Sequence, residues 1–197
     1  MQVENRKDEV PFAYYQEKFA ALDPAEAVSR VGECYKDGAF SLALLGRSYT
    51  VTHPQAVITP AAALPVQTFL LRWLLEGDSQ RDDGNYYTFR ELPWGEVYIQ
   101  AYTGRVLKRS AFTFGTRLLS FAAACEKMGA EKLPAGDCGY RFSFLPGLKM
   151  QLIIWEGDEE FPPSAQILYS GGFAGLTAED RVIAAEILIS TVKANMQ

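Results

Sequence analysis

The chain has 197 residues, of which 48% are hydrophobic and 22% are charged, and its formal net charge is −5. These values are typical of one soluble globular domain, and we expect residues 1–197 to form it. Lysine and arginine are scattered along the acidic chain, so it could not neutralise a row of phosphates, and nucleic acid is not an expected partner.

The sequence also predicts where the protein works. No apolar run approaches the roughly 18 residues that a membrane span needs, so we predict no membrane partner. The first nine residues, Met1–Glu9, are rich in charge and lack the apolar core of a signal peptide. We therefore expect a cytoplasmic protein in which residues 1–8 are a frayed leader to the first helix.

Three cysteines bear on redox chemistry and metal binding. Cys34, Cys125 and Cys138 lie far apart, and no two of them have C-x-x-C spacing. An odd number in a cytoplasmic chain argues against a disulfide framework and against a zinc or iron–sulfur site built from this chain alone. Cys125 falls on the apolar face of a predicted helix and is expected to be a core residue.

Two helices are predicted at the start of the chain. The first has an apolar side formed by Tyr14, Tyr15, Phe19 and Leu22. The second begins at Asp23–Glu26, where an aspartate can cap the helix and a proline occupies its first position.

A β-hairpin is expected after the second helix. Its first strand, at Phe40–Leu44, alternates large apolar and small residues, and the same period resumes at Tyr49–Val51. Gly46 and Arg47 would form a two-residue loop, and a leading glycine suits a type II′ turn.

The middle of the chain predicts two further helices. Apolar residues recur at intervals of three and four over Pro65–Glu76, which is the clearest helical pattern. A polar surface loop follows over residues 78–87. Val97 and Ile99 then suggest a short strand, and a longer helix is predicted from about Ala111 to Met128.

The last third of the chain predicts a three-strand antiparallel meander. Aromatic residues alternate up to Phe144, Pro146–Gly147 makes a turn, and Lys149–Trp155 is apolar on both faces, as a covered central strand would be. The final helix is predicted to begin at Thr177, whose hydroxyl caps the helix. The side chain of Asp180, three residues later, would accept a hydrogen bond from the backbone N–H of Thr177 in return. The expected fold class is α+β: a single domain with a mostly antiparallel sheet flanked by helices.

The loop that follows Lys149–Trp155 is unusually acidic. Trp155–Pro163 contains four carboxylates and two prolines. Asp158, Glu159 and Glu160 offer the oxygen ligands that Mg²⁺ and Ca²⁺ prefer, although their spacing is not that of an EF-hand. The alternative is a solvated hairpin end, since like charges ~4 Å apart repel by only about 1 kcal/mol in water.

Three other segments have ordinary interpretations. His53, the only histidine, is expected at the surface and cannot make a two-histidine metal site. The segment Ser170–Gly175 joins a strand to a helix but lacks phosphate-loop spacing, so it is predicted to be a flexible connection. An ion pair between Arg90 and Glu91 would anchor the turn that contains them.

Several segments together resemble one family. They are Leu44–Tyr49, Leu70–Leu75, Phe89–Leu92, Phe144–Pro146, Trp155–Pro162, Ala165, Ile167–Tyr169 and Leu176–Asp180. Over most of the chain they resemble domain of unknown function 3786, an uncharacterised family of anaerobic bacteria and archaea. Some members carry a four-cysteine iron–sulfur module ahead of this domain, which implies a role in anaerobic redox or one-carbon metabolism. This chain lacks that module, and Ser170 stands where the family pattern often has an aspartate.

We therefore expect a non-catalytic binding or accessory domain with an unidentified protein or small-molecule partner and no resident cofactor. Its predicted ligand-binding residues are Asp158, Glu159, Glu160, Arg90 and Arg105, which would meet if the acidic loop folds inward. One alternative is a metal-assisted enzyme that holds a divalent cation with the three carboxylates and an anionic substrate with the arginines. Another is a homodimeric interaction module that uses aromatic residues: Tyr86, Tyr87, Trp94, Tyr98 and Tyr102.

Overall fold

The computed structural model describes residues 9–32 and 34–196. Its helices are α1 (Glu9–Ala20), α2 (Pro24–Val31), α3 (Leu64–Glu76), α4 (Gly95–Tyr102), α5 (Arg109–Phe114), α6 (Leu118–Lys127) and α7 (Ala178–Asn195). A π-helical turn, Thr103–Lys108, joins α4 to α5, and 3-10 turns span Ser79–Arg81 and Gly171–Gly175. The predicted frayed leader, residues 1–8, lies outside the described residues.

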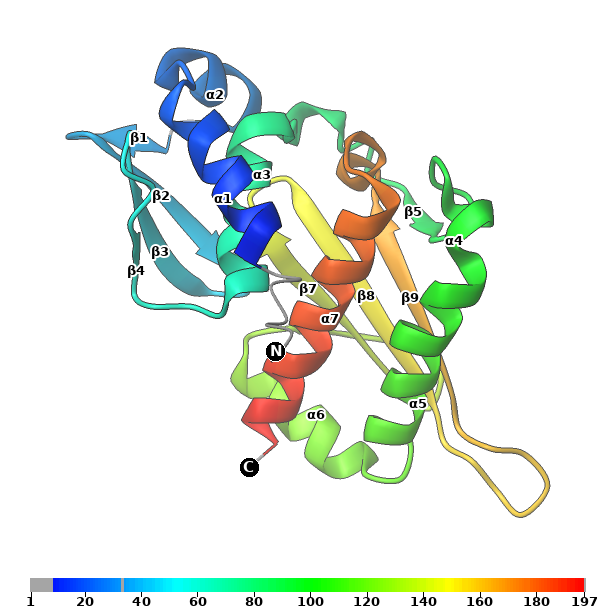
Figure 1. The fold of residues 1–197 in the computed structure, drawn as a ribbon. Coiled ribbons are helices and arrows are strands. Elements are labelled where there is room, and N and C mark those ends of the chain that lie inside the picture. The colour runs from blue at the N-terminus through cyan, green and yellow to red at the C-terminus, as the bar shows by residue number, and fades with distance from the viewer. Residues whose placement is uncertain (1–8, 33, 197) are drawn as a thin grey trace, which may run out of the picture.

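The strands form two antiparallel sheets (Figure 1). The four-stranded sheet has the order β1 (Tyr35–Lys36), β2 (Ala39–Leu44), β3 (Arg47–Thr52) and β4 (Ile58–Thr59). The five-stranded sheet has the order β5 (Tyr86–Thr88), β9 (Ser164–Ser170), β8 (Leu148–Trp155), β7 (Cys138–Leu145) and β6 (Glu131–Leu133). The predicted α+β class and the meander, which is β7-β8-β9, are confirmed.

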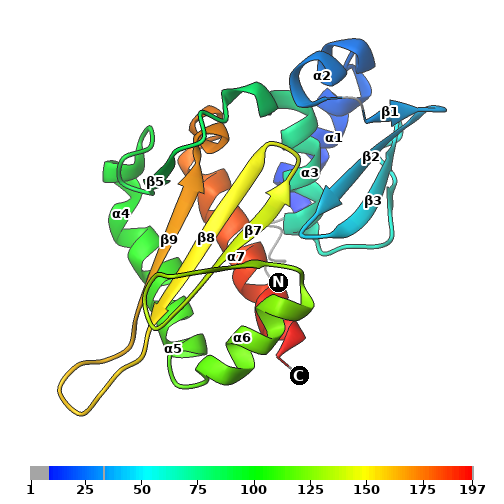
Figure 2. The same cartoon turned by 180° about the vertical axis from the view of Figure 1, so that it is seen from behind.

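Helices cover one face of the five-stranded sheet. Figure 1 shows α7 running along that face with α4 and α5 beside it. Figure 2 shows the opposite face, where the segment that links α6 to β7 crosses the strands and no helix of the described residues covers them. The two sheets share one hydrophobic core, to which β2 contributes Phe40 and β7 contributes Phe144. The strand β8 is central, and its residues on both faces are buried, as predicted.

Both predicted helix starts are confirmed. Asp23 caps α2 by accepting a hydrogen bond from the backbone N–H of Ala25. At α7, the Thr177 hydroxyl accepts from the backbone N–H of Asp180, and the Asp180 carboxylate accepts from the backbone N–H of Thr177. This reciprocal pair satisfies two backbone donors that the first helical turn cannot satisfy itself.

The hairpin between β2 and β3 turns one residue earlier than predicted. Its two loop residues are Leu45 and Gly46, with φ angles of 49° and 79°. Positive φ at both positions gives a type I′ turn, so the predicted type II′ turn is wrong. The backbone N–H of Leu45 donates to the carbonyl oxygen of Phe144 across 2.9 Å, which fixes the turn against β7.

The predicted strand around Val97 and Ile99 is wrong, because these residues lie in α4. The inward side chains follow helical spacing: Ile99 is half-buried, and Tyr102 and Val106 are buried. Val97 faces solvent instead. Burial of this stripe in tertiary packing overrides the strand preference of the two β-branched residues.

The predicted helix over 111–128 is interrupted. The helix α5 ends at Phe114 and α6 begins at Leu118. Gly115 lies between them, packed so closely that a Cβ there would collide with Pro163. The base of the acidic loop therefore packs directly against the break between α5 and α6.

The glycine-rich segment before α7 is a packed turn and not a flexible connection. Gly171, Gly172 and Phe173 are buried. A Cβ on Gly172 would lie 2.7 Å from the carbonyl oxygen of Gly147 and 2.9 Å from a methyl group of Leu148. Glycines are needed there because the segment lies close to the β7–β8 turn. This need cannot be read from the periodicity of the sequence.

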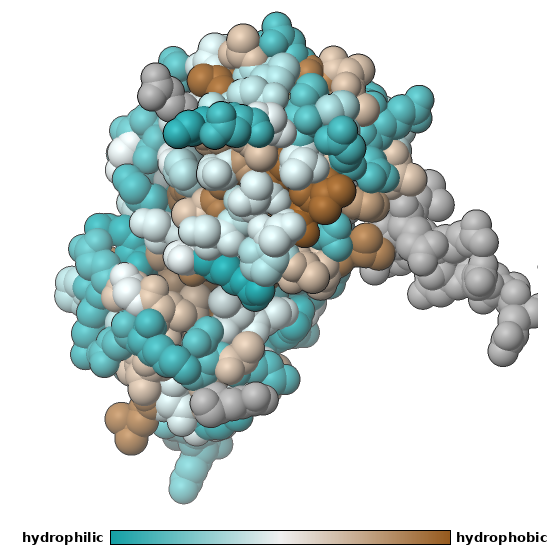
Figure 3. All heavy atoms as spheres, turned by 90° about the vertical axis from the view of Figure 1, so that its left-hand side faces the viewer, coloured by the Kyte–Doolittle hydropathy of each residue, from teal (hydrophilic) through white to brown (hydrophobic). Residues whose placement is uncertain are grey.

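The surface and the cysteines complete the fold. Among residues 9–32 and 34–196, no helix is both long and apolar enough to cross a membrane. Figure 3 views the side of the four-stranded sheet and shows mostly hydrophilic surface, with hydrophobic residues in small separate areas. All three cysteines are free, and the predicted core position of Cys125 is confirmed.

Candidate functional site

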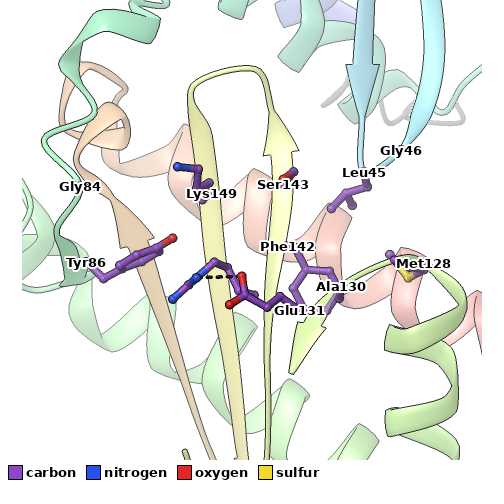
Figure 4. A pocket seen from close by; sticks show the side chains of 12 residues that line it. Leu45, Gly46, Gly84, Tyr86, Met128, Ala130, Glu131, Phe142, Ser143 and Lys149 are labelled. Carbon is purple, nitrogen blue, oxygen red and sulfur yellow. Dashed lines mark hydrogen bonds and ion pairs between the residues drawn. The ribbon is translucent and has the colours of Figure 1, made fainter. Parts of the chain in front are cut away.

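The candidate site is a cavity on the face of the five-stranded sheet opposite α7. Its volume is ≈ 670 Å³ (Figure 4). It is lined by Leu45, Gly46, Gly84, Tyr86, Met128, Gly129, Ala130, Glu131, Arg141, Phe142, Ser143 and Lys149. These residues come from segments far apart in the sequence, so only the folded chain brings them together.

The register of the meander creates the floor of the cavity. A two-residue turn joins β7 to β8, and it pairs Ser143 with Lys149 and Arg141 with Gln151. Successive residues of a strand point to opposite faces. Because Phe142 points into the core, the polar residues on either side of it must point outward into the cavity.

Arg141, which lines the cavity, is held by two contacts. Its Nη1 donates to Oε2 of Glu131 across 2.8 Å, from a residue directly opposite on β6. Its guanidinium carbon lies 5.4 Å from the centre of the Tyr86 ring, a cation–π distance. Its Nε is buried and has no hydrogen-bond partner among the residues that the structure describes.

Lys149 is the second cation of the cavity. Its Nζ lies 3.4 Å from Oδ2 of Asp82, which is long for a charge-assisted hydrogen bond. The Lys149 side chain is 48% exposed, and that of Arg141 is 33% exposed. Ion pairs this open to water typically contribute about 0–1 kcal/mol, so an incoming anion could replace either carboxylate at small cost.

Two turns form one rim of the cavity. Leu45 and Gly46 come from the four-stranded sheet, and Met128 and Ala130 come from the segment after α6 (Figure 4). Tyr86 stands on the opposite side. A polar floor between partly apolar walls suits a small molecule that bears an anionic group.

The structure does not bring the predicted ligand-binding residues together. Arg90 pairs with Glu96 across 3.0 Å, and not with Glu91 as predicted. Arg105 bonds to Glu179 and Glu186 of α7, each across 3.0 Å. The predicted convergence of these arginines with the acidic loop is therefore wrong. A ligand-binding role for each residue taken singly stays a prediction.

The acidic loop points away from the body of the molecule, as Figures 1 and 2 both show. Asp158, Glu159 and Glu160 are exposed, and Phe161 is 67% exposed. The Asp158 carboxylate accepts from the backbone N–H groups of Glu160 and Phe161, so it closes its own turn. This geometry matches the solvated hairpin end that the sequence left open as the alternative.

No set of three His, Cys, Asp or Glu side chains within residues 9–32 and 34–196 is arranged to hold a metal ion. The alternative of a metal-assisted enzyme at the acidic loop therefore gains no support from the described geometry, and a divalent metal there stays a prediction.

His53 is not at the surface as predicted. It is half-buried, with its ring centre 5.3 Å from that of Phe19 and 6.3 Å from those of Tyr35 and Phe40. Its Nε2 is buried without a hydrogen-bond partner in the described part of the chain. The return of β3 towards α1 places it among these aromatic rings.

The aromatic residues of the homodimer alternative occupy different environments. Tyr102 is fully buried, stacked on Phe89 with 3.9 Å between ring centres. Tyr86 lines the cavity. Trp94 is 72% exposed, and Tyr98 is also exposed. The set therefore does not form one surface.

Sequence reasoning did not assign Arg141, Lys149, Tyr86 or Glu131 to a ligand site, and it placed Tyr86 only in the homodimer alternative. A usable signal was present for the first two, because alternation along a strand assigns Arg141, between the core residues Tyr140 and Phe142, and Lys149, between Leu148 and Met150, to the opposite face. Tyr86 and Glu131 lie on strands of three residues, which carry too little periodicity to be oriented from sequence.

Comparison with known proteins identifies the family. A family model described as Domain of unknown function (DUF3786) matches residues 23–190. The chain belongs to this family. The match covers every residue that lines the cavity, so the cavity lies within the DUF3786 domain. No curated protein and no solved structure matches the chain.

Proposed function

We propose that this DUF3786 domain is a binding or accessory domain whose cavity on the five-stranded sheet receives an anionic small molecule. The observation that carries the proposal is the position of Arg141. Its guanidinium is oriented by Tyr86 and Glu131 at the floor of the cavity, and Lys149 adds a second positive charge. A guanidinium fork held in a fixed plane suits carboxylate and phosphate groups.

The role in anaerobic redox or one-carbon metabolism is part of this proposal. It rests on the family resemblance alone. In that setting the domain would hold an anionic metabolite, and another protein would supply the redox centre.

The proposal can be tested with two minimal probes, inorganic phosphate and acetate. We expect at least one to raise the melting temperature by mass action. Arg141→Gln should abolish this rise. Glu131→Gln should increase it, because the variant removes the carboxylate that competes for the guanidinium. Arg117→Gln, which changes an exposed arginine outside the cavity, is the matched control and should leave the rise unchanged.

The opposite outcomes would overturn the proposal. No rise with either anion would do so, as would a rise that persists in Arg141→Gln or shrinks in Glu131→Gln. Chemical-shift changes at the backbone amides of 141–149 on titration provide a readout that does not depend on stability.

A homodimer remains a second candidate. The exposed side chains of Trp94, Val97 and Tyr98 at the start of α4 favour it, because large apolar residues are usually covered when they cluster. Sedimentation at increasing concentration should show a dimer that Trp94→Ser and Val97→Ser weaken. A monomer throughout would eliminate this candidate.

A further inference from the structure

A second cavity adjoins the proposed site. Its volume is ≈ 570 Å³, and its walls come from the β2–β3 turn, the end of α6 and the last turns of α7. Leu45, Gly46 and Met128 line both cavities and stand at the edge of the first one in Figure 4. The two cavities are therefore neighbours that share these residues as a common ridge.

The second cavity carries two cations, Arg47 and Lys127. Both side chains are exposed, and Arg47 lies 5.3 Å from the centre of the Tyr49 ring. Among the residues that the structure describes, the walls of this cavity contain no carboxylate. The C-terminal ends of α6 and α7 each contribute roughly half a negative charge through their macrodipoles, which together offset about one of the two positive charges and leave the cavity positive.

The ridge between the cavities is held in a strained conformation. Leu45 has a φ of 49°, a left-handed conformation that costs a residue with a Cβ roughly 1–2 kcal/mol. Its hydrogen bond to Phe144 ties it to β7, the strand that also carries Arg141. One strand thus positions both the ridge and the principal anion-binding residue.

We infer that the two cavities form one bipartite site for an elongated molecule with an anionic group at each end and an apolar middle. The inference rests on the proposed function of the first cavity. Arg141 and Lys149 hold one anionic group, and Arg47 and Lys127 hold the other. The apolar middle crosses the ridge, where the Leu45 side chain and the adjacent methionine offer it contact.

The probes are α,ω-alkane bisphosphates and α,ω-alkane dicarboxylates of increasing chain length, each compared with the alkyl monoanion of the same length. Linking two anions makes the second contact intramolecular, so affinity should pass through a maximum at the length that spans the ridge. At that length the dianion should bind about tenfold tighter than the monoanion, or more. Calorimetric titration provides the dissociation constants.

Variants separate the two halves of the site. Arg47→Gln with Lys127→Gln should reduce dianion affinity to that of the monoanion and leave monoanion affinity unchanged. Each single substitution should give an intermediate loss. Lys108→Gln with Arg117→Gln, which changes two exposed cations outside both cavities, is the matched control and should change neither affinity. Melting curves establish that every variant is folded.

The outcomes distinguish this inference from the proposed function. Equal affinity for dianion and monoanion at every length overturns the bipartite site alone, as does an equal loss for both compounds in the double variant. Binding that survives Arg141→Gln overturns the proposed function, and binding of neither compound overturns both.

Discussion

Arg181, in the first turn of α7, donates from Nη1 to the carbonyl oxygen of Leu176 across 2.6 Å. The same guanidinium donates to the carbonyl oxygens of Phe173 and Pro93, and its carbon lies 5.6 Å from the centre of the Phe89 ring. The side chain is fully buried, and burial lowers the pKa of Arg181. This buried cation therefore ties α7 to the turn before it and to the turn that precedes α4.

Replacing Arg181 should be costly. In Arg181→Lys one ammonium nitrogen replaces the two guanidinium nitrogens that bond Phe173 and Leu176 on the one hand and Pro93 on the other, so at least one carbonyl group loses its partner. We expect a loss of about 2–4 kcal/mol in the free energy of unfolding, measured by urea denaturation. Arg90→Lys, at an exposed ion pair, is the control and should change it by less than about 1 kcal/mol. A similarly small change in Arg181→Lys would refute the proposed anchoring role.

Loss of the cap of α7 should reduce the stability of the fold less than the replacement of Arg181. In Thr177→Ala the backbone N–H of Asp180 loses its acceptor, and the free energy of unfolding should fall by about 1 kcal/mol. Thr177→Ser keeps the hydroxyl and should stay close to the parent. Thermal or urea unfolding of the three proteins checks this order, and equal stability of Thr177→Ala and the parent would contradict it.

A substitution at Gly172 tests whether the glycine-rich segment before α7 is a packed turn or a flexible connection. In Gly172→Ala the new methyl group would press on Gly147 and Leu148, so we expect a loss of about 1–3 kcal/mol in stability. Gly104→Ala is the control, because a Cβ there meets open space in a helical segment. It should be neutral or stabilising by about 0.4–1 kcal/mol. A stabilising Gly172→Ala would indicate that the segment is flexible after all.

The hydrogen bonds of Glu91 predict that the stability of the fold depends on pH. Its carboxylate accepts from the backbone N–H and the hydroxyl of Thr88, across 2.7 and 2.8 Å, and these bonds lower the pKa of Glu91 below its ordinary value of 4.5. A lowered folded-state pKa stabilises the fold above 4.5, and this contribution is lost as pH falls through the folded-state value. The parent should therefore be more stable than Glu91→Gln at pH 7, and the gap in melting temperature should close below pH 4.5. A gap that stays constant from pH 7 to pH 3 would rule this out.

The family and the local signals could be recognised from the sequence. The caps at Asp23 and Thr177, the Pro146–Gly147 turn and the central strand before Trp155 all depend on residues close together in the chain. Their geometry is set by short-range hydrogen bonds and alternation, so local sequence suffices. The same sequence placed a strand at Val97, where the burial of a helical stripe decides the outcome.

The candidate site could not be derived in the same way. The acidic loop has the most unusual composition in the sequence, yet its carboxylates face water. Arg141 and Lys149 have the pattern of ordinary strand residues, and their place in the candidate site depends on which segments surround them. Composition reports how charged a segment is, whereas a site depends on where charges from different segments meet.

By itself, the sequence determined the α+β class, the order of the last three strands and the membership of the DUF3786 family, because these depend on local patterns. Only the tertiary structure decided that Tyr86, Glu131 and Arg141 meet on one face of the sheet. The physical reason is that a cavity forms between strands whose pairing spans long stretches of chain. That pairing is fixed by burial in a shared core and not by the residues next to the site.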